Sequence, residues 1–188
     1  YDAAGHLAGL EPLVPEAPKA IRRRIVENLP PPLLKPIVPF LQTVHDRAAV
    51  EIQRGCTQGC RFCQAGMIYR PTRERTPAEV VEATRQLLQN TGYDELSLLS
   101  LSTTDHSQIV PMIDALNATF PELKISIPST RVDSFSVDVA NAVAKGKKHT
   151  LTLAPEAGSQ RLRNAVNKLV SDADLLGAPL RLIVSERN

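Results

Sequence analysis

The feature that most limits the fold of this chain is an alternation, repeated four times, of a short apolar run and a longer amphipathic segment. The runs that predict strands are residues 48–52, 95–101, 123–127 and 150–153. The helical segments that follow them are residues 76–91, 109–116, 137–144 and 159–166. Because consecutive parallel strands must be joined by a crossover, this order predicts a parallel sheet with right-handed strand–helix connections.

The chain has 188 residues, whereas a complete eight-stranded (β/α) barrel needs about 250. We therefore predict an α/β fold, a partial (β/α) barrel of parallel strands with alternating helices and about four to five βα units, the fifth strand falling at residues 180–184. Eight prolines lie between Leu10 and Phe40, so residues 1–44 are predicted to form a proline-rich linker or N-terminal arm. Residues 45–176 are predicted to form the incomplete barrel core, and residues 177–188 an atypical C-terminal tail.

Composition excludes several classes of function. The 43% hydrophobic and 22% charged residues are ordinary for a globular domain, and a net charge of +2 gives no clear nucleic-acid signal. No apolar run approaches the roughly 20 residues that span a bilayer, so no membrane association is expected. The three cysteines are grouped and odd in number, which indicates a reducing, cytoplasmic location. Since the chain begins at Tyr1, we expect it to be a piece of a longer protein.

The three cysteines, Cys56, Cys60 and Cys63, lie within eight residues, directly after the first predicted strand. Thiolates bind soft metals, and three of them leave one coordination position open. A zinc ion would need a fourth ligand, and the four histidines are scattered along the chain. The spacing therefore favours an iron–sulfur cluster. The alternatives are a zinc site, uncommitted thiols, and a zinc-binding or cluster-binding module without catalytic activity.

The arrangement Cys56-x-x-x-Cys60-x-x-Cys63, with Phe62 before the last cysteine, resembles the signature loop of the radical S-adenosylmethionine (SAM) enzymes. Residues 51–71 also resemble the subgroup in which a cobalamin (B12)-binding module precedes the radical domain. The resemblance implies a [4Fe-4S] cluster with the three cysteines on three irons and SAM on the fourth. It implies reductive cleavage of SAM to a 5′-deoxyadenosyl radical, which abstracts hydrogen from an unknown substrate, and places Phe62 beside the adenine. A phenylalanine packed in the core is the alternative.

The resemblance also implies an electron donor of the flavodoxin or ferredoxin type, and it leaves cobalamin open as a cofactor bound by a module outside this chain. It stops near Asn167, so an inactive fragment that binds a cluster is a further alternative. No catalytic residue of the protein itself is assigned.

Further candidate residues for SAM binding follow the other three predicted strands, whose carboxyl ends open on one side. Ser102 and Thr103 follow the second strand, where most of the family has a glycine-rich motif, and a simple helix cap is the alternative for them. Arg131 follows the third strand, and its guanidinium could clamp a carboxylate, a surface ion pair being equally open. Glu156 follows the fourth and resembles the family's acid in an acid-x-Gly-Ser turn, able to reach a ribose hydroxyl or the amino group.

Overall fold

The computed structural model describes residues 1–9, 11–18, 20, 22–41, 43–144 and 149–177. Its elements, in chain order, are β1 (Ala48–Glu51), β2 (Gln53–Arg54), α1 (Gln64–Ile68), β3 (Arg73–Glu74), α2 (Pro77–Thr91), β4 (Glu95–Leu99), the 3-10 turn η1 (Thr103–Asp105), α3 (Ile109–Thr119), β5 (Lys124–Thr130), α4 (Val137–Ala144), β6 (His149–Leu153) and α5 (Gln160–Ala165). Residues 172–177 are also helical.

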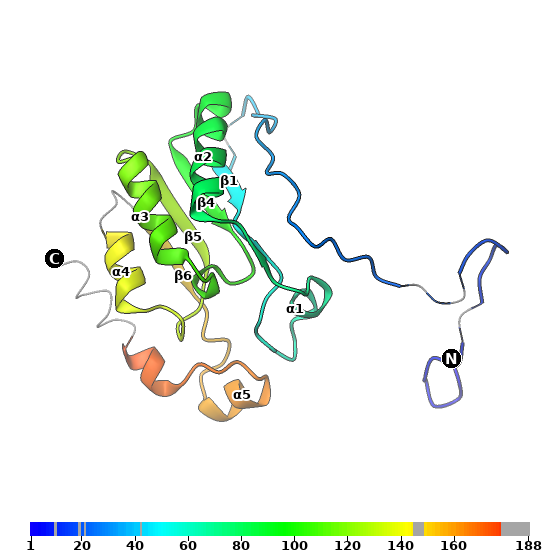
Figure 1. The fold of residues 1–188 in the computed structure, drawn as a ribbon. Helices are drawn as coiled ribbons and strands as arrows, with labels where there is room; N and C mark the ends of the chain where they lie inside the picture. Colours follow the sequence, from blue (N-terminus) through cyan, green and yellow to red (C-terminus); the bar gives the residue numbers. More distant parts are fainter. Residues whose placement is uncertain (10, 19, 21, 42, 145–148, 178–188) are drawn as a thin grey trace.

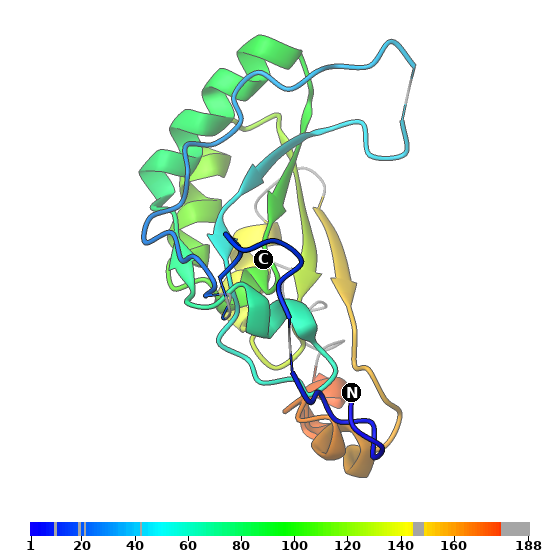
Figure 2. The same cartoon turned by 90° about the vertical axis from the view of Figure 1, so that its right-hand side faces the viewer.

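Four strands form one sheet in the order β1-β4-β5-β6, and every neighbouring pair is parallel. The spatial order follows the chain order, as it does around a (β/α) barrel. Figure 1 and Figure 2 show α2, α3 and α4 on one side of this sheet. The predicted α/β class, a partial barrel with four βα units, is therefore confirmed. The predicted fifth strand at residues 180–184 lies outside the described residues.

The core lies between the sheet and these helices because alternate strand residues point to the same face. Leu96 and Leu98 of β4 and Ile125 of β5 are fully buried there, against Leu87 of α2 and Ile113 of α3. The helix α2 begins at the predicted capping box, in which the Thr76 side chain accepts from the backbone of Glu79 and the Glu79 side chain accepts from the backbone of Thr76. The apolar periodicity and the cap together fix this layer.

Two strand boundaries differ from the prediction by more than one residue. The strand β4 ends at Leu99 and not at Leu101, because its partner β1 ends at Glu51, which pairs with Leu99. The strand β5 continues to Thr130, beyond Ile127, because after a register irregularity it pairs again with Leu153 of β6. Pairing between strands, which is not visible in apolar runs, decides where each strand stops.

The segment before β1 has no helix or strand in the part of it that is described. It runs past α1 and α2 (Figure 1), and its backbone carbonyls accept from the side chains of Arg73, Arg75 and Asn90. Arg75 donates to Pro30 O, and Asn90 donates to Leu34 O at 2.8 Å. In return, Arg23 of this segment donates to Ile68 O at the end of α1 at 2.5 Å. Within the described chain, no helix has the length and apolar content needed to cross a bilayer.

Candidate functional site

The cysteine loop leaves the sheet at the carboxyl end of β1 and is turned sharply at Gly55. This glycine has φ +87°, a left-handed conformation that residues with a Cβ rarely adopt. A Cβ at this position would lie 2.6 Å from Tyr69 O and 2.7 Å from Pro71 O. The backbone of the returning segment therefore passes directly against Gly55. Only glycine permits this close approach, which brings the two ends of the cysteine loop together.

Each of the three sulfurs is close to an N–H donor. The backbone N–H of Gln58 donates to Cys56 Sγ at 3.4 Å, and that of Gly66 donates to Cys63 Sγ at 3.3 Å. The second bond makes Cys63 the N-cap of α1. The donor to Cys60 is different, because it is the Nη1 of Arg131, 3.9 Å from the sulfur. All three cysteines are free thiols, and such donors stabilise the thiolate form that binds metal.

Arg131 lies in a buried charge cluster at the ends of β4 and β5. Its Nη2 donates to Asp133 Oδ2 at 2.6 Å, and its Nε lies 4.0 Å from Asp105 Oδ2 without any hydrogen-bond partner. Asp105 in turn accepts from Gln58 of the cysteine loop at 2.9 Å and from the Ser102 hydroxyl at 2.7 Å. The cluster therefore joins the cysteine loop to the loops that follow two other strands.

The surroundings alter two pKa values at this site. Burial raises the pKa of the Cys56 thiol, and the nearby Asp105 carboxylate adds to the increase, whereas the Gln58 amide and the Arg131 charge oppose it. Burial alone would lower the pKa of Arg131, but the hydrogen bond and charge of Asp133 outweigh it and raise the pKa above its usual value. Arg131 is thus a permanent buried cation beside Cys60.

The other residues predicted to bind SAM differ in how exposed they are and in what they contact. Phe62 is 56% exposed, so it is not packed in the core and its ring is accessible at the cysteine loop. Ser102 is buried and donates to Asp105, and Thr103 is buried with its hydroxyl 2.9 Å from that of Ser100. Neither hydroxyl caps the turn η1. Glu156 pairs with Lys168 at 2.6 Å and has φ +69°.

The segment that contains α5 packs on the cysteine loop, a contact that sequence reasoning missed. The backbone N–H of Arg61 donates to Val166 O at 2.9 Å, and its guanidinium donates to Ala165 O at 2.6 Å. The side chain of Asn167 donates to Gly59 O at 2.7 Å. These partners lie more than 100 residues apart in sequence, and no spacing or motif links them. The lysine that follows, Lys168, is 6% exposed.

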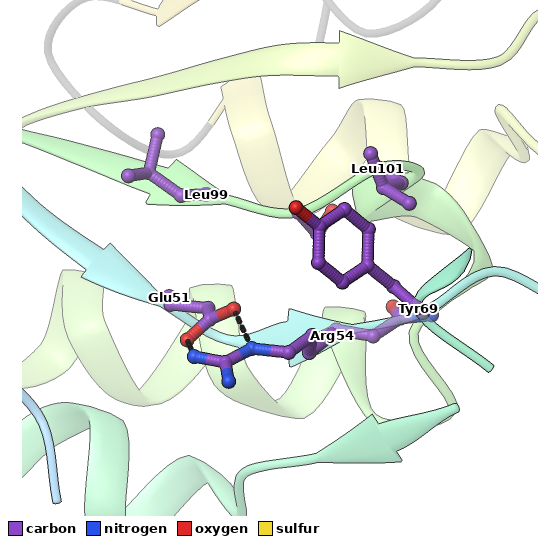
Figure 3. Close-up of a pocket in the computed structure, with 8 residues that line it drawn as sticks. Glu51, Arg54, Tyr69, Leu99 and Leu101 are labelled. Atoms are coloured by element: carbon purple, nitrogen blue, oxygen red, sulfur yellow. Dashed lines mark hydrogen bonds and ion pairs between the residues drawn. The ribbon is translucent and has the colours of Figure 1, made fainter. Parts of the chain in front are cut away.

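A cavity of about 510 Å³ opens beside the same strand ends, on the face of the sheet opposite the helices. Figure 3 shows its polar part, Tyr69 and the pair of Glu51 and Arg54, together with the apolar side chains of Leu99 and Leu101. The guanidinium of Arg54 donates to both carboxylate oxygens of Glu51, at 2.7 and 2.6 Å. The cavity can accommodate a small molecule that has an apolar body and a polar end.

The donor set fits a cluster bound by three cysteines. In the part of the chain that is described, no three His, Cys, Asp or Glu side chains are close enough to hold a metal ion as they stand. The three thiols are nevertheless free, lie on one loop and each has an N–H donor. His6 contacts Asp2, His45 contacts Arg47, and His106 contacts Arg75 O, so these histidines are engaged elsewhere. Three sulfur donors, with none of these three imidazoles beside them, suit iron–sulfur chemistry better than zinc.

The chain matches a protein family over most of its length. Residues 50–178 match the family described as the radical SAM superfamily. An uncharacterized protein, MJ0966, of Methanocaldococcus jannaschii is 33% identical over 129 residues, which cover 69% of this chain and 28% of that protein. The tRNA-2-methylthio-N(6)-dimethylallyladenosine synthase of Prosthecochloris aestuarii is 22% identical over 129 residues, 64% of this chain and 29% of that enzyme. The chain therefore spans less than a third of the length of these relatives.

The fold is also similar to a solved structure. The radical S-adenosylmethionine methyltransferase TsrM of Kitasatospora setae, with cobalamin and a [4Fe-4S] cluster bound, superposes with a TM-score of 0.61 at 13% sequence identity. The similarity covers 74% of this chain and 29% of that protein. At this identity the similarity establishes the shared fold.

Proposed function

Because this chain belongs to the radical SAM superfamily, we propose that Cys56, Cys60 and Cys63 bind three irons of a [4Fe-4S] cluster and leave the fourth iron to SAM. Such a cluster supplies one electron that cleaves SAM to methionine and a 5′-deoxyadenosyl radical, which takes hydrogen from a substrate. The observation that carries the proposal is the loop itself, in which three free thiols, each with an N–H donor, follow a strand of a parallel sheet.

We assign SAM contacts to the residues around this loop. The exposed ring of Phe62 is available to stack on the adenine. Glu156 can accept from a ribose hydroxyl or from the amino group. Ser102 and Thr103 are buried at the end of β4, and we assign their hydroxyl oxygens as further acceptors for SAM. Arg131 keeps an Nε that has no hydrogen-bond partner and can donate to a carboxylate. Glu156 pairs with Lys168, the residue after Asn167, whose side chain donates to Gly59 O of the cysteine loop.

The remaining assignments concern partners and organisation. We propose that a flavodoxin or ferredoxin supplies the electron, that the cavity beside Tyr69 takes part of the substrate, and that any cobalamin is bound by a module outside this chain. The proposed division into an arm (1–44), a radical SAM core (45–176) and a tail (177–188) follows from the sequence pattern. Free thiols and an oxygen-sensitive cluster suit the cytoplasm.

Anaerobic reconstitution of the full chain with iron and sulfide tests this proposal. We expect about four irons per chain, a cluster signal on reduction, and release of 5′-deoxyadenosine when SAM and reductant are added. The Cys60→Ala variant should lose the cluster. Purification without oxygen that yields one zinc and no iron, or equal iron uptake by Cys60→Ala, would contradict the proposal and favour a non-catalytic metal-binding module.

A further inference from the structure

The three cysteine sulfurs differ in the charge of their N–H donors. Cys56 and Cys63 accept from neutral backbone amides of their own loop, whereas Cys60 lies beside the guanidinium of Arg131, 71 residues away. Arg131 is only 7% exposed. A full positive charge is thus held in a poorly solvated position next to the Cys60 sulfur.

Two carboxylates limit the effect of this charge. Asp133 holds the guanidinium at 2.6 Å and has its other oxygen, Oδ1, buried without a hydrogen-bond partner. Asp105 lies 4.0 Å from Arg131 Nε and accepts from Gln58 in the cysteine loop. One cation, Arg131, and two anions, Asp133 and Asp105, therefore lie on the Cys60 side of the cysteine loop. The other two sulfurs accept from neutral backbone amides. The hydrogen bonds of Asp105 and Arg131 reach the loop from two different strand ends.

We propose that Arg131, opposed by Asp133 and Asp105, is a positioning residue that sets the reduction potential of the cluster through the Cys60 thiolate. This inference rests on the proposed function, because it concerns the cluster that the three cysteines would bind. It assigns the side chain of Arg131 a role toward the cluster in addition to any contact with SAM. The reduction concerned is the transfer of one electron from the reductant to the cluster.

The expected sign follows from electrostatics. Reduction adds one negative charge to the cluster, and a nearby cation stabilises the reduced form more than the oxidised form. Water screens the interaction less than it would at the surface, because Arg131 is only 7% exposed. Removal of the Arg131 charge therefore makes reduction harder. Removal of the Asp133 charge makes reduction easier.

Charge changes of opposite sign separate this role from a purely structural one. Arg131 also ties the strand ends together, since its backbone N–H donates to the Thr104 hydroxyl at 3.2 Å. A loosened loop would disturb the cluster in the same direction in every variant, whereas an electrostatic effect reverses between Arg131→Gln and Asp133→Asn. Arg131→Lys keeps the charge and serves as the conservative rescue. Arg85→Gln, which removes an exposed arginine of α2, is the matched control.

The experiment is a redox titration of the reconstituted full chain, followed by electron paramagnetic resonance after iron and sulfide contents are shown to match. At a fixed potential, we expect Arg131→Gln to decrease the ratio of reduced to oxidised cluster at least about tenfold, which is about 59 mV for one electron. Asp133→Asn should increase the ratio, and Arg131→Lys and Arg85→Gln should remain close to wild type.

Shifts of the same sign in Arg131→Gln and Asp133→Asn, or no shift in either variant, would overturn the inference. If Arg131→Gln fails to assemble a cluster, Asp133→Asn decides alone, and an unchanged potential there is sufficient to reject the role. Failure of the proposed function is distinguishable, because the wild type would then take up no cluster at all.

Discussion

The two faces of the sheet differ in what they do, and the neighbouring residues Leu98 and Leu99 of β4 show the difference. Leu98 is fully buried under the helices, whereas Leu99 is 42% exposed and lines the cavity on the opposite face. The covered face is filled by apolar side chains from strands and helices. The open face and the strand ends above it carry the charged pairs, the thiols and the cavity. We therefore expect the covered face of this four-stranded sheet to determine the stability of the fold, and the open face and the strand ends to carry the chemistry.

The largest effect is expected from Leu98→Ala, which should lower the free energy of unfolding by about 2–5 kcal/mol because it leaves a cavity in a packed core. The matched change Leu99→Ala should cost less than about 1 kcal/mol, since half-exposed side chains contribute little. Denaturant unfolding of both variants measures the difference. Equal losses of unfolding free energy in the two variants would show that both faces of the sheet are packed alike.

The next effect concerns the turn into the cysteine loop. Gly55→Ala should cost more than about 2 kcal/mol, because a left-handed conformation alone costs about 1–2 kcal/mol and the Cβ would also meet backbone oxygens. Gly92, at the end of α2, has φ +75° and no atom within 4 Å of the position that a Cβ would occupy, so Gly92→Ala should show only the conformational cost. Thermal unfolding and iron uptake distinguish them, and only Gly55→Ala is expected to impair cluster assembly. Normal iron uptake by Gly55→Ala would argue against a need for this close approach.

A smaller effect is expected on the helix layer. Thr76→Ala removes the cap of α2 and should cost about 1 kcal/mol, without any change in the iron content. Unfolding and iron analysis of the same preparation provide the test. Loss of iron in this variant would show that cluster binding by the cysteine loop depends on the helices of the covered face.

The smallest effect is pH-dependent and involves His106, which is buried and whose Nε2–H donates to Arg75 O at 3.1 Å. Burial lowers its pKa below the ordinary value of 6.5. Between the unfolded-state and folded-state pKa values, the unfolded chain holds more protons, so the free energy of unfolding falls as the pH drops below about 6.5. His106→Gln should reduce this acid-side loss of stability. Parallel pH profiles for variant and wild type would contradict the assignment.

The covered face could be predicted from sequence because its determinants are local. The apolar periodicity of residues 109–116 and the capping box at Thr76 specify α3 and α2 without reference to distant residues. The ends of β4 and β5 were placed wrongly by two and three residues because they depend on pairing with β1 and β6. A strand ends where its partner ends, and this information is not contained in either strand alone.

The sequence names the candidate site residues, but it predicts contacts among them only where they are consecutive. The three cysteines and Phe62 share one loop, so their spacing identifies them. The contact of Arg131 with Cys60 and that of Asn167 with Gly59 join residues that are far apart in sequence. Such contacts arise because the carboxyl ends of parallel strands meet at one edge of the sheet. That rule predicts a shared edge, but it does not specify which side chains touch there.

The most direct test of a cluster bound by these three cysteines is the electron paramagnetic resonance spectrum of the reduced, reconstituted full chain, recorded before and after the addition of SAM. A cluster held by Cys56, Cys60 and Cys63 leaves one iron free, so SAM should change the spectrum of wild type, and Cys60→Ala should give no such signal. A spectrum that SAM leaves unchanged, or a signal of equal intensity in Cys60→Ala, would show that these cysteines do not hold a cluster with an iron open to SAM.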